Sequence, residues 1–176
     1  MLPFLLLFSL CGTLEAITLL RFDLEALART AICVIVGTCT VSQTEIIAGQ
    51  PYTQLTFEVG EVVKGQAGAS LKVCLPGGEY RGRQLHLAGM PQFAPGEEVV
   101  LFLTEPDWLG HPWPVGLSQG KFRVQRDAAA KLRVRQDAGE ARLHGGQGAS
   151  LDEMELEEFL SRVRRLAKEG PGDAQR

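Results

Sequence analysis

The sequence holds few of the residues that metal and redox sites require. Its 176 residues include four cysteines and three histidines. The histidines, His86, His111 and His144, lie far apart in the sequence, and none belongs to a His-x-x-x-His pattern; no Cys-x-x-Cys pair occurs either. Because structural metal sites usually show such short ligand spacings, the sequence predicts neither a metal nor another cofactor.

An excess of positive charge is also lacking. Eighteen Lys and Arg residues stand against 21 Asp and Glu, so the formal net charge is -3 and no global attraction for nucleic acid exists. On an OB-like barrel, a local basic and aromatic patch would suit nucleic acid; it would consist of Tyr80, Arg81, Arg83, Phe93, Lys121 and Phe122. We favour solvated basic residues and core aromatics at these positions, and expect no nucleic-acid partner.

Long hydrophobic runs are missing except at the start of the chain. Leu2–Leu10 is almost wholly apolar but short for a membrane-spanning helix. It is typical of an export signal over residues 1–16, cleaved after Ala16. Two alternatives are a lipoprotein signal with the lipid on Cys11, which the bulky Leu10 disfavours, and a buried N-terminal helix. We expect a periplasmic or secreted protein without a stable membrane span after cleavage.

Removal of the signal would leave Cys33, Cys39 and Cys74, an odd number that allows at most one internal disulfide. Cys33 and Cys39 lie on one predicted strand, about 20 Å apart, so they cannot pair with each other. Either could face Cys74 on a neighbouring strand. We favour the simpler interpretation that Cys33 and Cys39 are small apolar core residues.

Strand signals dominate what the sequence does contain. Thr53–Val59 alternates between apolar and polar residues, and Val99–Leu103 is continuously apolar, as in a buried strand. Ala31–Val41 predicts a central strand in which Gly37 introduces a bulge, and Ser42–Pro51 is the expected connection to the next strand. Leu71–Leu75 predicts a further strand, with Cys74 on the face opposite the apolar residues and near solvent.

Helices are expected at the two ends of this β-domain. Phe22–Arg29 has a plausible N-cap in Asp23 and one apolar face. Ser150–Glu153 matches the S-x-x-E capping box, and apolar residues follow it at helical spacing: Leu151, Met154, Phe159, Val163 and Leu166. The predicted organisation is a signal peptide over 1–16, a β-barrel domain over 17–137, a linker over 138–149, an amphipathic helix over 150–170 and a disordered tail over 171–176.

Binding residues are predicted in two irregular segments. Pro76–Gly96 is a glycine- and proline-rich ribbon with an irregular strand at 80–87, and Glu105–Pro114 is a long turn with two tryptophans, residues that often anchor interfaces. Short strands are expected at 115–117 and 121–124. The candidate binding residues are Tyr80, Arg81, Pro91, Phe93, Trp108, Trp113, Gln119 and Lys121, and the candidate structural glycines are Gly37, Gly77, Gly78, Gly89, Gly96 and Gly120.

Candidate nucleophiles lack their usual context. Gly116–Gly120 matches G-x-S-x-G around Ser118, but a nucleophile elbow needs a helix after the serine, whereas a strand is predicted there. We therefore favour a glycine-rich hairpin turn. Cys74 with His86 is the one Cys–His pair considered, and the adjacent Glu97 and Glu98 are interpreted as solvated. The sequence predicts no enzyme; catalysis by Cys74 and His86, or by Ser118, is kept as an alternative.

Several motifs together resemble an uncharacterised family of exported bacterial domains, which occur alone or near secreted matrixin-type metalloproteases. They are Ala31–Val41, T-x-L-x-F-x-V at 53–59, Val63–Gly65, Pro76–Gly78, Gly89-x-Pro-x-Phe-x-x-Gly-Glu97, Val99–Leu103 and Val115–Phe122. The similarity covers residues 22–166. This chain has Ile32 where such sequences often carry Asp, and Cys33 and Cys39 where they usually carry Val.

A more distant similarity is to the netrin-like, OB-type barrel of the tissue inhibitors of metalloproteinases. It is carried by Val34–Gly37 and by a long strand that ends in Val62–Gly65. Those inhibitors bind the protease zinc through the α-amine of an N-terminal cysteine, and cleavage after Ala16 would leave no cysteine at the mature start.

These observations together predict a mainly β, antiparallel, OB-like or netrin-like barrel or sandwich of six to eight strands. The function expected from it is non-enzymatic recognition of an unknown protein partner, for which a secreted metalloprotease is one candidate. The alternative is a metalloprotease inhibitor or protease-accessory domain.

Overall fold

The computed structural model describes residues 22–137 and 153–168. The predicted signal peptide, Cys11, the linker and the tail lie outside these residues. The chain runs through α1 (Leu24–Thr30), β1 (Cys33–Ile47), β2 (Gln50–Lys64), β3 (Ser70–Pro76), β4 (Gly78–Tyr80), β5 (Arg83–Leu85), β6 (Glu98–Leu103), a 3₁₀ helix η1 (Leu117–Gly120), β7 (Lys121–Arg126), β8 (Leu132–Gln136), β9 (Met154–Glu155) and α2 (Leu156–Lys168).

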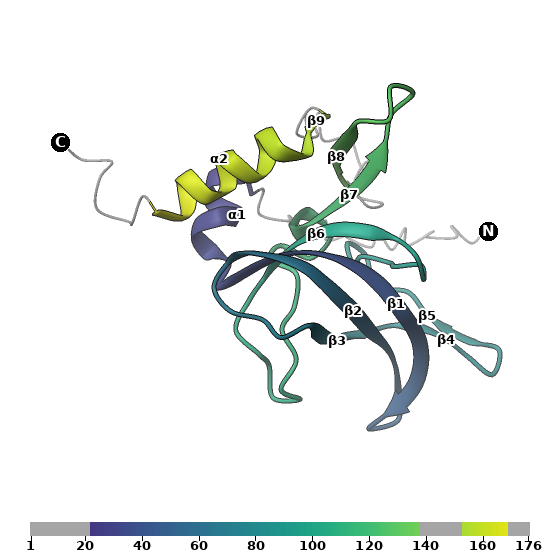
Figure 1. Cartoon of the computed structure of the whole chain (residues 1–176). Helices are drawn as coiled ribbons and strands as arrows, with labels where there is room; N and C mark the ends of the chain where they lie inside the picture. Colours follow the sequence, from purple (N-terminus) through teal and green to yellow (C-terminus); the bar gives the residue numbers. More distant parts are fainter. Residues whose placement is uncertain (1–21, 138–152, 169–176) are drawn as a thin grey trace, which may run out of the picture.

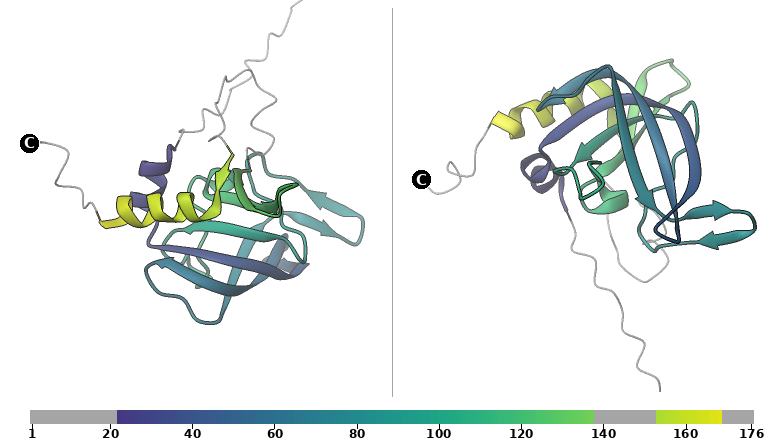
Figure 2. Two further views of the ribbon diagram at one scale, coloured as in Figure 1. Left: turned by 45° about the horizontal axis from the view of Figure 1, so that its top comes forward. Right: turned by 90° about the horizontal axis from the view of Figure 1, so that it is seen from below.

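The main sheet is antiparallel, and the mainly β prediction is confirmed. It has seven strands in the order β3-β2-β1-β6-β7-β8-β9, and β4 and β5 form a separate two-stranded hairpin. The sheet curls strongly along the long β1–β2 hairpin, as the two views of Figure 2 show. It does not close, because β3 and β9 are its edges. Of the predicted barrel or sandwich, the large antiparallel sheet is present, but it is not closed into a barrel.

The two faces of the sheet carry separate cores, because alternate residues of a strand point to opposite sides. On β1, Val34 and Val36 face the helices, whereas Ile35 and Cys39 face the inside of the curl. α1 and α2 lie together over the first face (Figure 1), where the rings of Phe102, Phe122 and Phe159 contact one another. The second face is filled from β1, β2, β3 and β6 and is covered by the ribbon residue Phe93.

The first helix forms where the sequence predicts it. The Asp23 side chain accepts a hydrogen bond from the backbone N–H of Ala26 at 2.7 Å, which makes it the N-cap. At the other end, the Lys64 ammonium donates to the carbonyl oxygens of Ala28 (2.7 Å) and Ala31 (2.5 Å). Lys64 thus satisfies carbonyls that a helix end leaves open and ties α1 to the end of β2.

Two strand boundaries differ from the prediction. Ser42–Pro51 is no connection: β1 continues to Ile47, and the turn before β2 consists of Ala48 and Gly49. The outer part of β1, residues 41–47, is exposed or half-buried throughout, so it lacks the apolar alternation that predicts a strand. Gly37 lies at a register shift between β1 and β2, as predicted.

The region after Leu75 also differs from the prediction. The irregular strand expected at 80–87 is a hairpin, β4 and β5, and Cys74 is buried at 1% exposure rather than near solvent. Residues 115–117 form no strand; the chain turns there into η1.

The C-terminal helix begins at Leu156, six residues after Ser150. Met154, predicted on the helix, pairs instead with Val134 of β8. Ser150 lies outside the described residues, and Glu153 is not helical. The apolar stripe does dock on the sheet, because Phe159, Leu160 and Val163 are buried in the helix-side core.

Candidate functional site

An exposed tryptophan marks the loop between β6 and η1. Trp108 has 76% of its surface exposed, the largest value among the exposed large hydrophobic residues of the described chain. Its neighbour Trp113 packs partly buried against the core inside the curl. The two predicted tryptophans therefore differ in role, since Trp113 belongs to the framework and Trp108 faces solvent. We call residues 104–114 the Trp108 loop.

Asp107 organises the Trp108 loop from within. Its carboxylate accepts hydrogen bonds from the backbone N–H of Leu109 (2.9 Å) and His111 (3.1 Å) and from the indole N–H of Trp113 (2.9 Å). Its own N–H donates to the carbonyl oxygen of His111 at 2.9 Å. These bonds hold the loop in one shape before any partner arrives. Asp107 is not among the residues predicted above, although aspartate before a turn is a known signal for such bonding.

The Trp108 loop is also fixed at its base. The backbone N–H of Thr104 donates to the Trp113 carbonyl at 2.8 Å, and the Trp113 N–H donates to the Thr104 hydroxyl at 3.1 Å. Leu103 and Pro114 form a bridge directly beside them. The loop is thus a short extension of the sheet rather than a loose connection.

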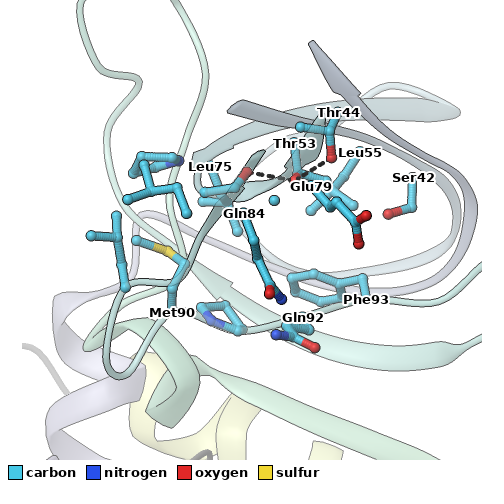
Figure 3. A pocket seen from close by; sticks show the side chains of 16 residues that line it. Ser42, Thr44, Thr53, Leu55, Leu75, Glu79, Gln84, Met90, Gln92 and Phe93 are labelled. Atoms are coloured by element: carbon cyan, nitrogen blue, oxygen red, sulfur yellow. Dashed lines mark hydrogen bonds between the residues drawn. The ribbon is translucent and has the colours of Figure 1, made fainter. Parts of the chain in front are cut away.

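A pocket lies between the ribbon and the outer part of the β1–β2 hairpin. Its volume is about 260 Å³. Ser42, Thr44 and Thr53 line it from the hairpin, Glu79 and Gln84 from β4 and β5, and Met90, Gln92 and Phe93 from the following segment (Figure 3). The Thr53 hydroxyl donates to the Gly77 carbonyl at 2.8 Å and lies 3.3 Å from the Thr44 hydroxyl.

Gly78 allows the ribbon to approach the hairpin closely enough to form this pocket. A Cβ atom at Gly78 would lie 2.4 Å from the Thr44 hydroxyl and 2.5 Å from that of Thr53, and its φ is +125°. A side chain is therefore excluded both by contact and by backbone conformation. Gly77, Gly89 and Gly96 also have positive φ. At Gly120 a Cβ would lie 2.5 Å from the Val115 carbonyl oxygen.

Lys121, predicted as an exposed binding residue, is completely buried at 0% exposure. Its ammonium lies 2.9 Å from Glu97 and 3.1 Å from Asp137, donates to the Gln92 carbonyl, and sits 4.3 Å from the centroid of the Phe93 ring. A buried ammonium needs such partners because desolvation is costly. Lys121 therefore joins the ribbon to β7 and to the end of β8.

Arg123 completes this charge cluster and pairs with the same two acids, at 2.9 Å from Glu97 and 3.2 Å from Asp137. The interpretation of Glu97 as a solvated carboxylate is thus wrong, because its side chain is 15% exposed and holds two cations. Phe93 and Phe122 are core residues. The basic and aromatic patch therefore does not form as a surface around Lys121.

The other predicted binding residues are spread over the ribbon and η1. Tyr80 and Arg81 lie at the tip of the β4–β5 hairpin, with the Arg81 guanidinium 5.4 Å from the centroid of the Tyr80 ring. Pro91 is buried beside the pocket. The Gln119 side chain accepts a hydrogen bond from the Phe22 N–H at 2.8 Å and so ties η1 to the segment before α1.

The candidate nucleophiles are poorly placed for attack. Cys74 is buried and His86 is exposed. Burial raises the pKa of the Cys74 thiol above its ordinary value, and the charges of Glu45 and Asp107 raise it further, which disfavours the nucleophilic thiolate. Ser118 is 4% exposed and lies in η1. The expected hairpin turn at 116–120 is thus a 3₁₀ turn, and neither the strand nor the α-helix of a nucleophile elbow flanks it.

All three described cysteines are free and buried. Cys33 and Cys39 belong to the core inside the curl, as predicted, and neither is joined to Cys74. Within residues 22–137 and 153–168, no group of three or more His, Cys, Asp or Glu side chains is placed to hold a metal ion. Neither described helix is long and apolar enough to cross a membrane.

Comparisons with protein-family models, with curated proteins and with solved structures find no match for this chain. The Trp108 loop and the pocket are therefore the features of this chain that bear on its function.

Proposed function

We propose that this protein is an exported, non-enzymatic binding module that recognises a protein partner through the Trp108 loop. The observation that carries the proposal is a tryptophan exposed at 76% on a loop held by three hydrogen bonds to one carboxylate. Tryptophan is the residue most enriched among the few side chains that dominate interface energies. A preformed loop also loses less conformational entropy on binding than a mobile one.

The size of the expected contribution follows from the exposed area. Large aromatic side chains bury about 150–250 Å² in interfaces. Covering about 150 Å² of the Trp108 ring would contribute about 4 kcal/mol at 25 cal/mol per Å², before the costs of association. Trp108 alone would thus supply the energy of an interface hot spot.

The tip of the β4–β5 hairpin is part of this proposal. Tyr80 and Arg81 are held together there by a cation–π contact, and both residue types are enriched among interface anchors. The finer description of the fold as OB-like or netrin-like also stays a proposal. The curl of β1 and β2 and the bulge at Gly37 support it, although the sheet is open.

The test uses the mature protein, immobilised and exposed to envelope and culture-medium extracts of its native host. We expect a partner that the wild-type protein retains and that binds Trp108→Ala about thirtyfold or more weakly, the scale of a hot spot. Ile46→Ala is the matched control, because Ile46 is also an exposed large hydrophobic residue, at 42%, and lies on β1. Both variants should unfold at the wild-type urea concentration. Equal retention by wild type and Trp108→Ala would refute the proposal.

The candidate partner named by the resemblance, a secreted metalloprotease, has its own measurement. A dose-dependent fall in the rate of such a protease would identify the module as an inhibitor or accessory domain. An unchanged rate at excess protein would remove that alternative and leave the binding module in place.

A further inference from the structure

The pocket beneath the β4–β5 hairpin has an unusual balance of charge. Among the 16 described residues that line it, Glu79 is the only one with an ionisable side chain. Its carboxylate points into the pocket from β4, on the side of Ser42 (Figure 3). No ion pair to Glu79 occurs within the part of the chain that the structure describes. The nearby acids Glu97 and Asp137, by contrast, are neutralised by two cations.

Apolar side chains also line the pocket. Leu55 and Leu75 are each 2% exposed and Phe93 is 9% exposed, so these three side chains form a fixed floor. Polar acceptors stand at the rim. The Ser42 hydroxyl and the side-chain amides of Gln84 and Gln92 can each accept a hydrogen bond through oxygen.

The volume limits what can enter. Pockets for complete drug-sized ligands range over about 300–1,000 Å³, and this one has about 260 Å³. It therefore suits one part of a larger molecule. A long side chain with an apolar stem and a cationic head matches an apolar floor with a single carboxylate at its edge.

We infer that this pocket receives a lysine or arginine side chain of the partner protein. The stem lies against Phe93 and Leu55, and the cationic head pairs with Glu79 and donates to the acceptors at the rim. The inference rests on the proposed function for the nature of the partner, but it concerns a different surface from the Trp108 loop. It assigns to the ribbon a specific task, the recognition of positive charge.

The test needs no knowledge of the partner. The full chain, labelled with ¹⁵N, is titrated with N-acetyl-lysine methylamide and with the norleucine analogue, which keeps the stem but lacks the ammonium group. We expect saturable shifts at the amides of Gly77, Gly78 and Phe93, with the norleucine analogue binding about fivefold or more weakly, the scale of one charge-assisted hydrogen bond at a partly open site. The lysine affinity should also fall as salt is added.

The matched pair of variants is Glu79→Gln and Glu58→Gln. Glu58 is likewise exposed on a strand but does not line the pocket. Glu79→Gln should weaken lysine binding about fivefold or more, and Glu58→Gln should leave it unchanged. Equal affinities for the lysine and norleucine analogues, an unaffected Glu79→Gln variant, or no saturable shift at all would each overturn the inference. Binding of a free diamine such as putrescine tenfold more tightly than the lysine analogue would also overturn the inference.

The two proposals fail separately. A Trp108→Ala variant that loses the partner but still binds the lysine analogue supports both of them. Loss of lysine recognition in a protein whose partner capture still depends on Trp108 rejects the pocket inference and leaves the binding module intact.

Discussion

Replacing Lys121 by methionine is expected to destabilise the protein severely while changing little of the side-chain volume. Methionine fills the same space but leaves Glu97 and Asp137 without their buried cation. Removing one partner of a buried ion pair costs about 3–5 kcal/mol. Here the cost is reduced to about 2–4 kcal/mol, because Arg123 still contacts both acids and their side chains are 15% and 20% exposed.

That loss is large enough to measure by two methods. At about 2–4 °C per kcal/mol for a chain of this size, a loss of about 3 kcal/mol lowers Tm by about 6–12 °C. Urea unfolding followed by far-UV circular dichroism gives the free energy directly, with an unchanged slope if the denatured state is unaffected.

Arg123→Met is the matched control, because Arg123 contacts the same two acids but its side chain is 48% exposed. An exposed pair contributes about 0.2–1 kcal/mol, so this variant should lose far less stability. The double variant Lys121→Met with Glu97→Gln should lose less stability than the sum of the single changes, since the second change removes one of the two negative charges that Lys121 neutralises. If Lys121→Met costs no more than Arg123→Met, the burial argument is refuted.

Two further perturbations test the ribbon and the thiols. Gly78→Ala should cost about 2 kcal/mol or more in urea unfolding, because of its φ of +125° and its contacts with two hydroxyls, whereas Gly60→Ala, whose Cβ would meet nothing closer than 3.7 Å, should be nearly neutral. Equal costs would contradict the close approach. Since burial raises the pKa of Cys74 from 9.0, the unfolded thiol ionises first, and its contribution to stability is lost as pH rises above about 9. Burial lowers the pKa of Lys64 from 10.5, so Lys64 makes the protein more stable as pH rises and opposes the effect of Cys74. The test therefore compares two proteins that both contain Lys64. Between about pH 8 and pH 10, the free energy of unfolding of Cys74→Ala should fall less than that of the wild type. If the free energies of unfolding of wild type and Cys74→Ala change in parallel with pH, the Cys74 thiol does not contribute to the pH dependence of stability.

The sequence predicts elements well where the signal is local. Val99–Leu103 is a continuous apolar run, and β6 is buried there on both sides. Asp23 caps α1 through a bond to a residue three positions later, and the turn after β7 is likewise held by short-range bonds to Asp127. Each of these features depends on residues that are close together in the chain.

Features that depend on distant residues were predicted poorly. The burial of Lys121 is decided by Glu97 and Asp137, which lie 24 positions before it and 16 after it, and nothing near Lys121 signals their arrival. The outer parts of β1 and β2 are held by pairing across the hairpin, as between Thr44 and Thr53, and not by an apolar face.

At the start of α2, helix formation competes with strand pairing. Met154 has the spacing of a helical stripe, yet it pairs with Val134 as a strand. Local propensity is a weak prior, and a free partner at the sheet edge overrides it. In the candidate site, too, local sequence gives only part of the answer. The two tryptophans are conspicuous in the sequence, whereas the different roles of Trp108 and Trp113 depend on Asp107.

The unequal surroundings of the two tryptophans give the protein an optical reporter of its own. Trp113 donates its indole N–H to Asp107 and is partly shielded, whereas the Trp108 ring stands in water. Light emitted by Trp108 should therefore respond to anything that covers the ring, while Trp113 supplies a nearly constant background. Because these are the only two tryptophans in the chain, the difference between wild type and Trp108→Phe isolates the exposed fluorophore. Occupancy of the loop can thus be followed without attaching a dye.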